Sequence, residues 1–343
     1  MDITAWAVEH KLPVLELNPP VIGEVQPYIA GDAMAQEEFA KQHQVLERPQ
    51  TLVAIENASI RDVVGFVELP DGQICYEGNW WLPYLQEHPA YRRRFFFKHR
   101  YLKGNWYSLL CLWSSEYYHW FHDVLPRLEN ALPHLPGDTR ILINEAPRAY
   151  QLQSLKAYGI GAGRLELQPS SVRTRVERLW FATPVGHSTF GSGEVIGRVA
   201  GRLKRHFSVC HTNSQPRRVY VSRQKAMSRR VVNETELLPL LKERGFDLIV
   251  LEDMSWTDQL RLFSTTEAIV GPHGAGLVNM MFALENTAIW EISPQSRTLP
   301  SCYLVLGRQL GCRFERLHAQ LVGDELMMDM SLRPELIRSL DEF

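Results

Sequence analysis

The 343-residue sequence contains no run that reaches the ~18 apolar residues of a membrane-spanning helix, so we expect no membrane span. Its first residues lack a basic segment followed by an apolar one, so we expect no signal peptide. The five cysteines are odd in number, scattered and never spaced as Cys-x-x-Cys, which disfavours a disulfide framework and a structural zinc site. Together these absences favour a protein of the reducing cytoplasm.

The sequence also lacks an excess of either charge, because 37 Lys and Arg residues face 39 Asp and Glu residues. A net charge of −2 disfavours nucleic acid as a general partner. A hydrophobic fraction of 45% and a charged fraction of 22% are typical of a globular protein and exclude a disordered chain or a coiled coil. The length suits about two domains.

The first 207 residues predict an N-terminal domain in which a small β-meander precedes an α/β region. Short apolar runs alternate with turns over about residues 50–80, and the Pro70-Asp-Gly72 turn between two of them indicates a hairpin. Farther along, the apolar spacing predicts helices over 113–132, 148–158 and 193–207, and strands over 139–144 and 176–183.

Residues 208–320 predict a C-terminal domain of the Rossmann type. Short apolar runs separated by 10–15 helical residues indicate βαβ units and a parallel sheet. The strands are expected over 218–222, 247–251, 268–271 and 288–292, and the helices over 234–244, 255–264 and 276–283. The remaining residues, 321–343, are expected to form a tail or helix that packs back on the N-terminal domain.

The strongest charge feature lies in residues 198–230, which hold ten Lys and Arg residues and no Asp or Glu. Arg223 and Arg229 flank a loop at the carboxyl end of the first strand of the second domain, the edge at which open α/β sheets bind ligands. Because the planar guanidinium matches pairs of phosphate oxygens, this stretch predicts an anion site. The alternative is a solvated basic surface.

The glycine-rich sequence Gly271-Pro-His-Gly-Ala-Gly276 joins an expected strand to an expected helix. Such a turn lets the backbone approach a phosphate, the helix start offers N–H groups, and His273 adds a side-chain donor. The alternative is a tight turn whose glycines supply positive φ angles. The spacing is neither Gly-x-Gly-x-x-Gly nor a P-loop, which disfavours dinucleotide dehydrogenases and NTPases.

A third group of residues lies in Tyr117-Tyr-His-Trp-Phe-His-Asp-Val-Leu-Pro-Arg127. If this stretch is helical, His119, His122 and Asp123 share one side, and an imidazole beside a carboxylate can share a proton or bind an acceptor hydroxyl. A metal site is disfavoured because no second cluster of ligands accompanies them. The remaining alternative is a capped helix with one hydrogen-bonded histidine.

Three further residues lie at the ends of expected elements. Asn233 and Glu234 begin a helix, where capping is the default interpretation. Glu291 ends a strand, where a carboxylate either accepts ribose hydroxyls or lies on the surface. The basic and aromatic run from Arg92 to Tyr101 predicts a strand with a solvated face, with an anionic membrane surface as the alternative contact.

Taken in order, three segments resemble the motifs of glycosyltransferase family 61, the DUF563 group. They are His119-Trp-Phe-His-Asp123 with Leu125-Pro126, Tyr220-Val-Ser-Arg223 with Arg229-Arg-Val-Val-Asn-Glu234, and Gly271-Pro-His-Gly-Ala-Gly-Leu277. The similarity covers about residues 105–295. With no expected signal or membrane anchor, the chain resembles the bacterial members associated with capsule, exopolysaccharide or lipopolysaccharide assembly more than the eukaryotic members.

The resemblance implies a GT-B architecture, with two Rossmann-like domains facing across a cleft. It implies an inverting transfer of a sugar from a nucleotide sugar, usually UDP-linked, to a hydroxyl of a glycan or glycolipid, without an obligatory metal or cofactor. The implied enzyme is cytoplasmic, with a peripheral contact at the inner membrane as a further alternative. The competing classes are a non-catalytic binder of nucleotide sugars or glycans and a different Rossmann-type nucleotide-dependent enzyme.

Combining the resemblance with the residues gives a set of roles. Asp123 is expected to be the base that deprotonates the acceptor, with His119 as its close rival, and His122 and Arg127 to lie on the acceptor side. The leaving nucleotide is expected to contact residues of the second domain. These are Arg223, Arg229, Asn233, Glu234, His273, Gly274, Ala275, Gly276, Leu277 and Glu291.

Overall fold

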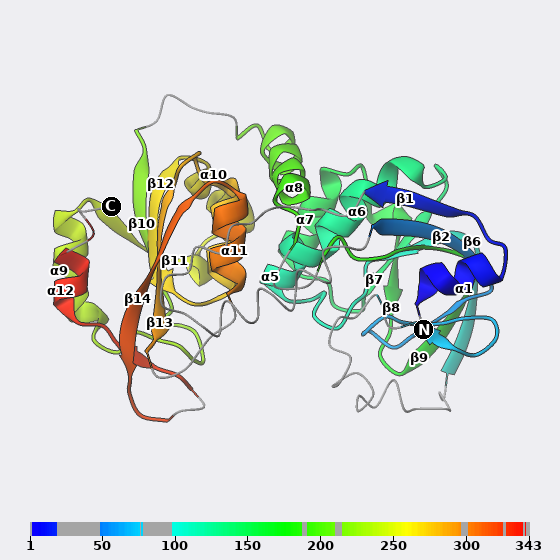
Figure 1. The fold of residues 1–343 in the computed structure, drawn as a ribbon, viewed down its shortest axis with the longest axis horizontal. Coiled ribbons are helices and arrows are strands. Elements are labelled where there is room, and N and C mark those ends of the chain that lie inside the picture. Colours follow the sequence, from blue (N-terminus) through cyan, green and yellow to red (C-terminus); the bar gives the residue numbers. More distant parts are fainter. Residues whose placement is uncertain are drawn as a thin grey trace. The chain divides into compact units, whose positions relative to one another are not determined.

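The computed structural model of the chain describes residues 2–18, 49–75, 77, 98–186, 191–209, 215–295, 301–324, 327–338 and 340. These residues form two compact units, of which the first ends at Val195 and the second begins at Ile196 (Figure 1). Each unit contains its own β-sheet, so the chain is a mixed α/β protein with two sheets. Cys210 and the basic and aromatic residues before Lys98 lie outside the described residues.

The first unit has a nine-stranded sheet that is parallel from β9 through β6 and β7 to the edge strand β8, and antiparallel elsewhere. Strand β6 pairs in parallel with β7 and β9, and β7 with β8, while β2 and β3 run antiparallel to β9. The elements are α1 (Ile3–Glu9), β1 (Val14–Asn18), β2 (Gln50–Glu56), β3 (Ser59–Arg61), β4 (Phe66–Glu68), β5 (Ile74–Cys75), β6 (Lys98–Ser108), α5 (Tyr117–His119), η1 (Trp120–Val124), α6 (Leu125–Ala131), η2 (Leu132–His134), β7 (Arg140–Asn144), α7 (Ala149–Lys156), η3 (Ala162–Arg164), β8 (Leu165–Gln168) and β9 (Val172–Ala182).

Local sequence accounts for several features of this unit. The Pro70-Asp-Gly72 turn joins the antiparallel strands β4 and β5 with Gly72 at φ +85°, which confirms the predicted hairpin. A buried apolar cluster forms the core, and its larger members include Trp6 of α1, Trp106 of β6 and Phe181 of β9. The helix expected from residue 113 begins instead at Tyr117.

The second unit has a six-stranded sheet in the order β11-β10-β12-β13-β14-β15, parallel except for β15. After α8 (Gly193–His206), which spans the boundary between the units, the elements are β10 (Arg217–Ser222), α9 (Glu234–Glu243), β11 (Phe246–Val250), η4 (Leu251–Asp253), α10 (Trp256–Ser264), β12 (Thr266–Pro272), η5 (Ala275–Phe282), β13 (Ala288–Pro294), α11 (Cys302–Gln309), β14 (Arg313–Leu321), β15 (Met330–Ser331) and α12 (Pro334–Arg338).

The order of the five parallel strands, numbered from β10, is 2-1-3-4-5, which is that of a doubly wound α/β sheet. Figure 1 shows α9 and α12 on one face of this sheet and α10 and α11 on the other. The chain therefore reverses its winding direction between β10 and β12. Ligands of such sheets bind outside the carboxyl ends of the strands at this switch point.

The predicted strands and helices of this unit are confirmed, with two corrections. The segment after β12 is a 3₁₀ helix, η5, rather than an α-helix. The carboxyl-terminal tail contributes Leu332, Ile337 and Leu340 to the core of the second unit, and α12 packs against α9. The expected packing of the tail on the N-terminal domain is therefore wrong. Among the described residues, no helix is long and apolar enough to cross a membrane.

Candidate active site

His119, His122 and Asp123 lie in a helical segment that follows β6 in the first unit. Helix α5 continues into the π-helical turn η1, which continues into α6. Pro126 gives a physical reason for the irregular turn, because proline has no N–H and its ring crowds the carbonyl four residues earlier, that of His122. Turns of this kind occur frequently at functional sites.

The carboxylate of Asp123 joins the two histidines. Nδ1 of His119 lies 2.7 Å from Oδ2, and Nδ1 of His122 lies 2.7 Å from Oδ1. Burial raises the pKa of Asp123, but the hydrogen bonds and charges of the two imidazoles outweigh burial and hold this pKa well below the usual carboxyl range. Asp123 is therefore ionised at neutral pH, accepts an N–H from each ring, and is a weak base.

The two histidines differ in what their second nitrogen contacts. His122 is buried, and its Nε2 accepts a hydrogen bond from the N–H of Gly191 at 3.3 Å. The side chain of His119 is 20% exposed and stacks on the ring of Trp113 at 4.9 Å. No other described residue bonds to Nε2 of His119. Of this group, Nε2 of His119 is the nitrogen able to take a proton from a hydroxyl.

Arg127 is buried and holds α6 to the end of β6. Its Nη2 donates to the carbonyls of Ser108 at 3.0 Å and Leu110 at 3.4 Å, while its Nε has no hydrogen-bond partner among the described residues. A buried guanidinium bonded to backbone carbonyls is not available to an acceptor. The geometry favours structural roles for Arg127 and His122, which the sequence had suggested for the acceptor side.

The ionised Asp123 predicts a loss of stability in acid. A carboxylate whose pKa is lowered in the folded state contributes stability above its unfolded pKa, about 4, and this contribution is lost as the pH falls through the folded value. We expect the free energy of unfolding to fall below pH 4 by up to about 1.4 kcal/mol more per pH unit in the native protein than in Asp123→Asn. Urea unfolding at pH 5, 4 and 3 measures this difference, and parallel acid curves would contradict it.

In the second unit, the basic loop and the glycine-rich turn meet at the switch point of the sheet. Arg223 directly follows β10, and His273 and Gly274 directly follow β12. A Cβ on Gly274 would overlap the guanidinium of Arg223, so the arginine lies directly on the backbone of the turn. The two features that the sequence singled out are therefore parts of one site.

The glycines serve close approach rather than positive φ, and the alternative of a φ-driven tight turn is wrong. None of Gly271, Gly274 and Gly276 adopts the left-handed backbone region, and Gly274 is extended at φ 175°. A Cβ at Gly276 would lie 2.5 Å from the side chain of Leu251. The N–H groups of Ala275, Gly276 and Leu277 begin η5, although that of Leu277 bonds to the carbonyl of Gly274.

Arg223 and Arg229 form a partly buried pair of like charges. Burial and the neighbouring Arg229 both lower the pKa of Arg223. Arg223 donates from Nε and Nη2 to the carbonyl of Ser228, and in the part of the chain that the structure describes the buried Nε of Arg229 has no hydrogen-bond partner. Arg229 also has φ +58°, which lies in the left-handed region that residues with a side chain rarely adopt. Residues held in this region cluster at functional sites. Neither arginine forms an ion pair with a carboxylate of the described residues.

His273 is a third hydrogen-bonding group beside the two arginines, and the buried carboxylate of Glu291 fixes its ring through a hydrogen bond. Its Nδ1 lies 2.5 Å from Oε1 of Glu291, whose Oε2 accepts from Nε of Arg316 at 2.9 Å. Burial raises the pKa of Glu291, but the combined effect of His273 and Arg316 is larger and in the opposite direction. The pKa of Glu291 is therefore lowered overall. Glu291 is fully buried within β13, so its interpretation as a surface residue at a strand end is wrong.

Asn233 and Glu234 make internal contacts beside the arginines. Glu234 accepts from the hydroxyls of Tyr220 at 2.8 Å and Ser222 at 3.0 Å, and it thereby fixes the end of β10 that carries Arg223. Asn233 donates to the carbonyl of Leu332 and accepts from its N–H. Both residues support the loop through these bonds, and the side chain of Asn233 forms no hydrogen bond with the backbone of the helix it precedes.

Two residues of the site carried no signal in the sequence. Arg316 lies opposite Glu291 in the register of β13 and β14, and Tyr303 of α11 packs edge-on against the His273 ring at 4.8 Å. The pairing of β13 with β14 brings Arg316 there, and the packing of α11 brings Tyr303. Among the described residues, no group of three or more His, Cys, Asp or Glu side chains is arranged to hold a metal ion.

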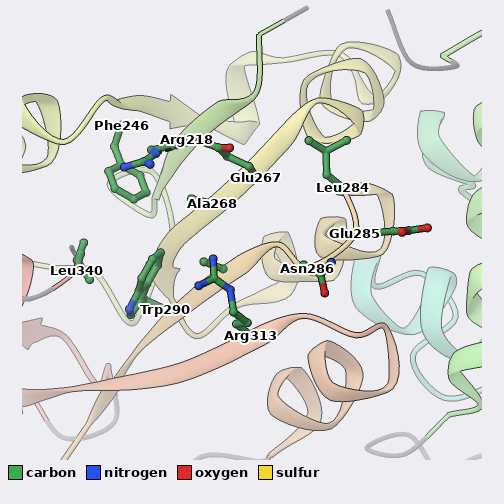
Figure 2. Close-up of a pocket in the computed structure, with 11 residues that line it drawn as sticks. Arg218, Phe246, Glu267, Ala268, Leu284, Glu285, Asn286, Trp290, Arg313 and Leu340 are labelled. Atoms are coloured by element: carbon green, nitrogen blue, oxygen red, sulfur yellow. Dashed lines mark hydrogen bonds and ion pairs between the residues drawn. The ribbon is translucent and has the colours of Figure 1, made fainter. Parts of the chain in front are cut away.

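A pocket of about 340 Å³ lies at the opposite, amino edge of the same sheet (Figure 2). Arg218, Ala268 and Arg313, near the starts of β10, β12 and β14, contribute to its lining, together with Phe246 and Trp290. It is distinct from the cluster of Arg223 and His273, which lies at the carboxyl ends of the strands.

The comparison with protein families adds an independent finding. The family model described as "Glycosyltransferase 61" matches residues 117–290, just over half of the chain. The match begins at α5, which carries His119, and ends one residue before Glu291. It therefore contains His119, His122 and Asp123 of the first unit and Arg223, Arg229 and His273 of the second.

Curated relatives match over a shorter stretch. The chain is 35% identical over 98 residues to the EGF domain-specific O-linked N-acetylglucosamine transferase of Drosophila melanogaster, covering 28% of this chain and 18% of that protein. It is 31% identical over 91 residues to the protein of the same name from Mus musculus, covering 25% and 17%. The corresponding protein of Pan troglodytes is 30% identical over 91 residues, with the same coverage. The chain thus spans less than a fifth of the length of these relatives.

Proposed function

The chain belongs to the glycosyltransferase 61 family, and from this premise we propose that it transfers a sugar from a nucleotide sugar to a hydroxyl of a glycan acceptor. The observation that carries the proposal is the meeting of Arg223, His273 and Gly274 at the switch point of a doubly wound sheet. Two guanidiniums that no described carboxylate pairs with, beside an imidazole, suit the diphosphate of a leaving nucleotide. The donor would bind there, with its phosphates against the turn.

The proposed acceptor base is His119 rather than Asp123. Asp123 is a weak base because both of its oxygens accept hydrogen bonds from imidazoles. It fixes His119 with Nδ1 protonated and Nε2 unprotonated, which is how a carboxylate orients a histidine base in other enzymes. Nε2 would accept the proton of the acceptor hydroxyl while the hydroxyl oxygen attacks the anomeric carbon. The bond from that carbon to the nucleotide diphosphate breaks on the opposite side, and this in-line displacement would invert the configuration of the sugar. The GT-B arrangement of the two units belongs to this proposal.

UDP-N-acetylglucosamine is the first donor to test, because the matched relatives are named N-acetylglucosamine transferases. The cationic groups supply the charge that a leaving diphosphate needs, so the proposed transfer is independent of a metal. A glycan or glycolipid of polysaccharide assembly is the proposed acceptor. A non-catalytic binder would take the same donor without transferring its sugar.

Thermal unfolding with a panel of nucleotides tests the donor site. UDP or a UDP-sugar at 100 times its dissociation constant should stabilise the native protein by about 2.7 kcal/mol, with or without EDTA. In Gly274→Ala the flexible Arg223 side chain is pushed off the turn, so we expect an intact fold and loss of most of this stabilisation.

Gly197→Ala is the matched control, since a Cβ there meets nothing within 4 Å, and it should respond as the native protein does. Stabilisation by GDP- or CMP-sugars alone would revise the donor. No response of the folded native protein to any nucleotide would contradict the donor site. Transfer of radiolabelled sugar to an acceptor or to water then separates the enzyme from the binder.

A further inference from the structure

Three charged or titratable side chains from adjacent strands form a buried chain behind the proposed donor site. Arg316 of β14 donates to Glu291 of β13, and Glu291 accepts from Nδ1 of His273, at the end of β12. The exposed fractions of these side chains are 12%, 0% and 6%. Glu291 therefore does not reach the surface, and its two oxygens contact the arginine and the histidine, which leaves it unsuited to bind ribose.

This chain determines how His273 can bind a ligand. An ionised carboxylate only accepts hydrogen bonds, so Nδ1 of His273 carries a proton and only Nε2 can gain or lose one. A histidine whose Nε2 is unprotonated presents a lone pair to phosphate oxygens, which is repulsive. A histidine protonated on both nitrogens presents a donor and a positive charge, and the buried Glu291 carboxylate stabilises that charge.

The groups around His273 carry more positive than negative charge in the unliganded protein. The described charged and titratable groups that face His273 or its neighbours are Glu291 of β13, Arg316 of β14, Cys302 and Tyr303 of α11, Arg223 and Arg229 of the loop after β10, and, more distantly, Glu252 of η4. Arg316 already balances the charge of Glu291. Arg223, whose guanidinium lies on Gly274, and Arg229 add positive charge beside the ring. A bound diphosphate reverses this balance by supplying negative charge at the same place.

We propose that Glu291 and Arg316 are positioning residues that make the binding of a nucleotide diphosphate depend on the uptake of one proton by Nε2 of His273. The proposal rests on the donor site proposed above and adds a role for residues that need not touch the donor. In the bound state, His273 is a cation that donates to a phosphate oxygen. Glu291 keeps Nδ1 of His273 protonated. Arg316 balances the charge of Glu291, so that in the unliganded protein Nε2 of His273 does not hold a proton permanently.

Calorimetric titration with UDP-N-acetylglucosamine tests this coupling, because that donor has no group that titrates near neutral pH. Titrations in buffers of different ionisation enthalpy, such as Tris and HEPES, report the number of protons taken up. For the native protein we expect uptake approaching one proton, and a Kd that rises by up to tenfold per pH unit over the linked window above about pH 6.5, where an imidazole ordinarily titrates.

Glu291→Gln keeps the shape of the side chain but removes its charge, so we expect proton uptake near zero and a Kd that no longer changes with pH. His273→Gln should behave in the same way. It provides a second test of the proposal if the Glu291→Gln protein does not fold. Arg316→Met leaves Glu291 without its counter-charge, so the linked window should move to higher pH. Glu315→Gln is the matched control, because Glu315 neighbours Arg316 and bonds instead to Nε1 of Trp290.

The possible failures are distinguishable. A native protein that binds no nucleotide and no nucleotide sugar would overturn the donor site itself, and this inference with it. A native protein that binds UDP-N-acetylglucosamine with no proton uptake would overturn the inference alone. Uptake that persists unchanged in both Glu291→Gln and His273→Gln would do the same.

Discussion

Replacing His119 with alanine is expected to lower kcat for sugar transfer by about 10²–10⁴-fold, the usual contribution of a general base. Donor binding should be unchanged, because the diphosphate groups are proposed to bind in the second unit. The physical reason is that Nε2 of His119 forms no hydrogen bond with any described residue. Both carboxylate oxygens of Asp123 and both ring nitrogens of His122, in contrast, already form hydrogen bonds. Steady-state kinetics and calorimetric binding of the donor, measured on the same preparation, check both halves of the expectation.

His134→Ala is the matched control, because His134 is an exposed residue of η2 in the same helical stretch and should leave kcat unchanged. Asp123→Asn separates the two candidate bases. If His119 is the base, the asparagine variant keeps part of its activity and its pH–rate profile shifts, since the imidazole loses the carboxylate that orients it. Full activity in His119→Ala, with none in Asp123→Asn, would instead identify Asp123 as the base.

Much of the second unit could be predicted from the sequence because its signals are local. Strands such as Val219–Val221 are apolar runs, Ser255 caps α10 by accepting from the N–H of Asp258, and Gly245 at φ +76° ends α9. Arg223 and His273 were identifiable because each directly follows a strand, and carboxyl ends of parallel strands meet at one edge. The order of the strands, which makes this edge a switch point, is a property of the fold and has no local signature.

The partners of the candidate residues were not predictable for the same reason. In the sequence, Glu291 lies near the end of a short apolar run that was predicted to be a strand. The pattern of apolar residues does not reveal that the strand continues to Pro294. Its pairing with Arg316 depends on the register of β13 and β14, across 25 residues of sequence. Arg127 and His122 appeared available to an acceptor, yet they are buried by contacts with β6 and with Gly191. Side-chain burial is decided by packing, which spacing along a helix does not report.

Replacing Arg223 with methionine is expected to separate activity from stability. Loss of a preorganised donor to a developing negative charge typically lowers kcat by about 10²–10³-fold, equivalent to 2.7–4 kcal/mol. In the unliganded protein the same change removes a partly buried charge that Arg229 repels and that no described carboxylate pairs with. Methionine preserves the apolar stem of the side chain, so the melting temperature should stay the same or rise, as it does where a site holds unfavourable charge for function.

Lys225→Met provides the comparison within the same loop, because Lys225 forms an exposed ion pair with Asp253 and such pairs contribute little. It should leave both kcat and the melting temperature nearly unchanged. The informative result is the combination in Arg223→Met, which calorimetric melting with and without UDP measures together with kinetics. A variant that melts at a distinctly lower temperature and keeps its kcat would mean that Arg223 is a structural residue. Like charges brought together with no ion-paired carboxylate among the described residues indicate that a ligand supplies the counter-charge, and a gain in stability on removing one of them would be the direct measure of that.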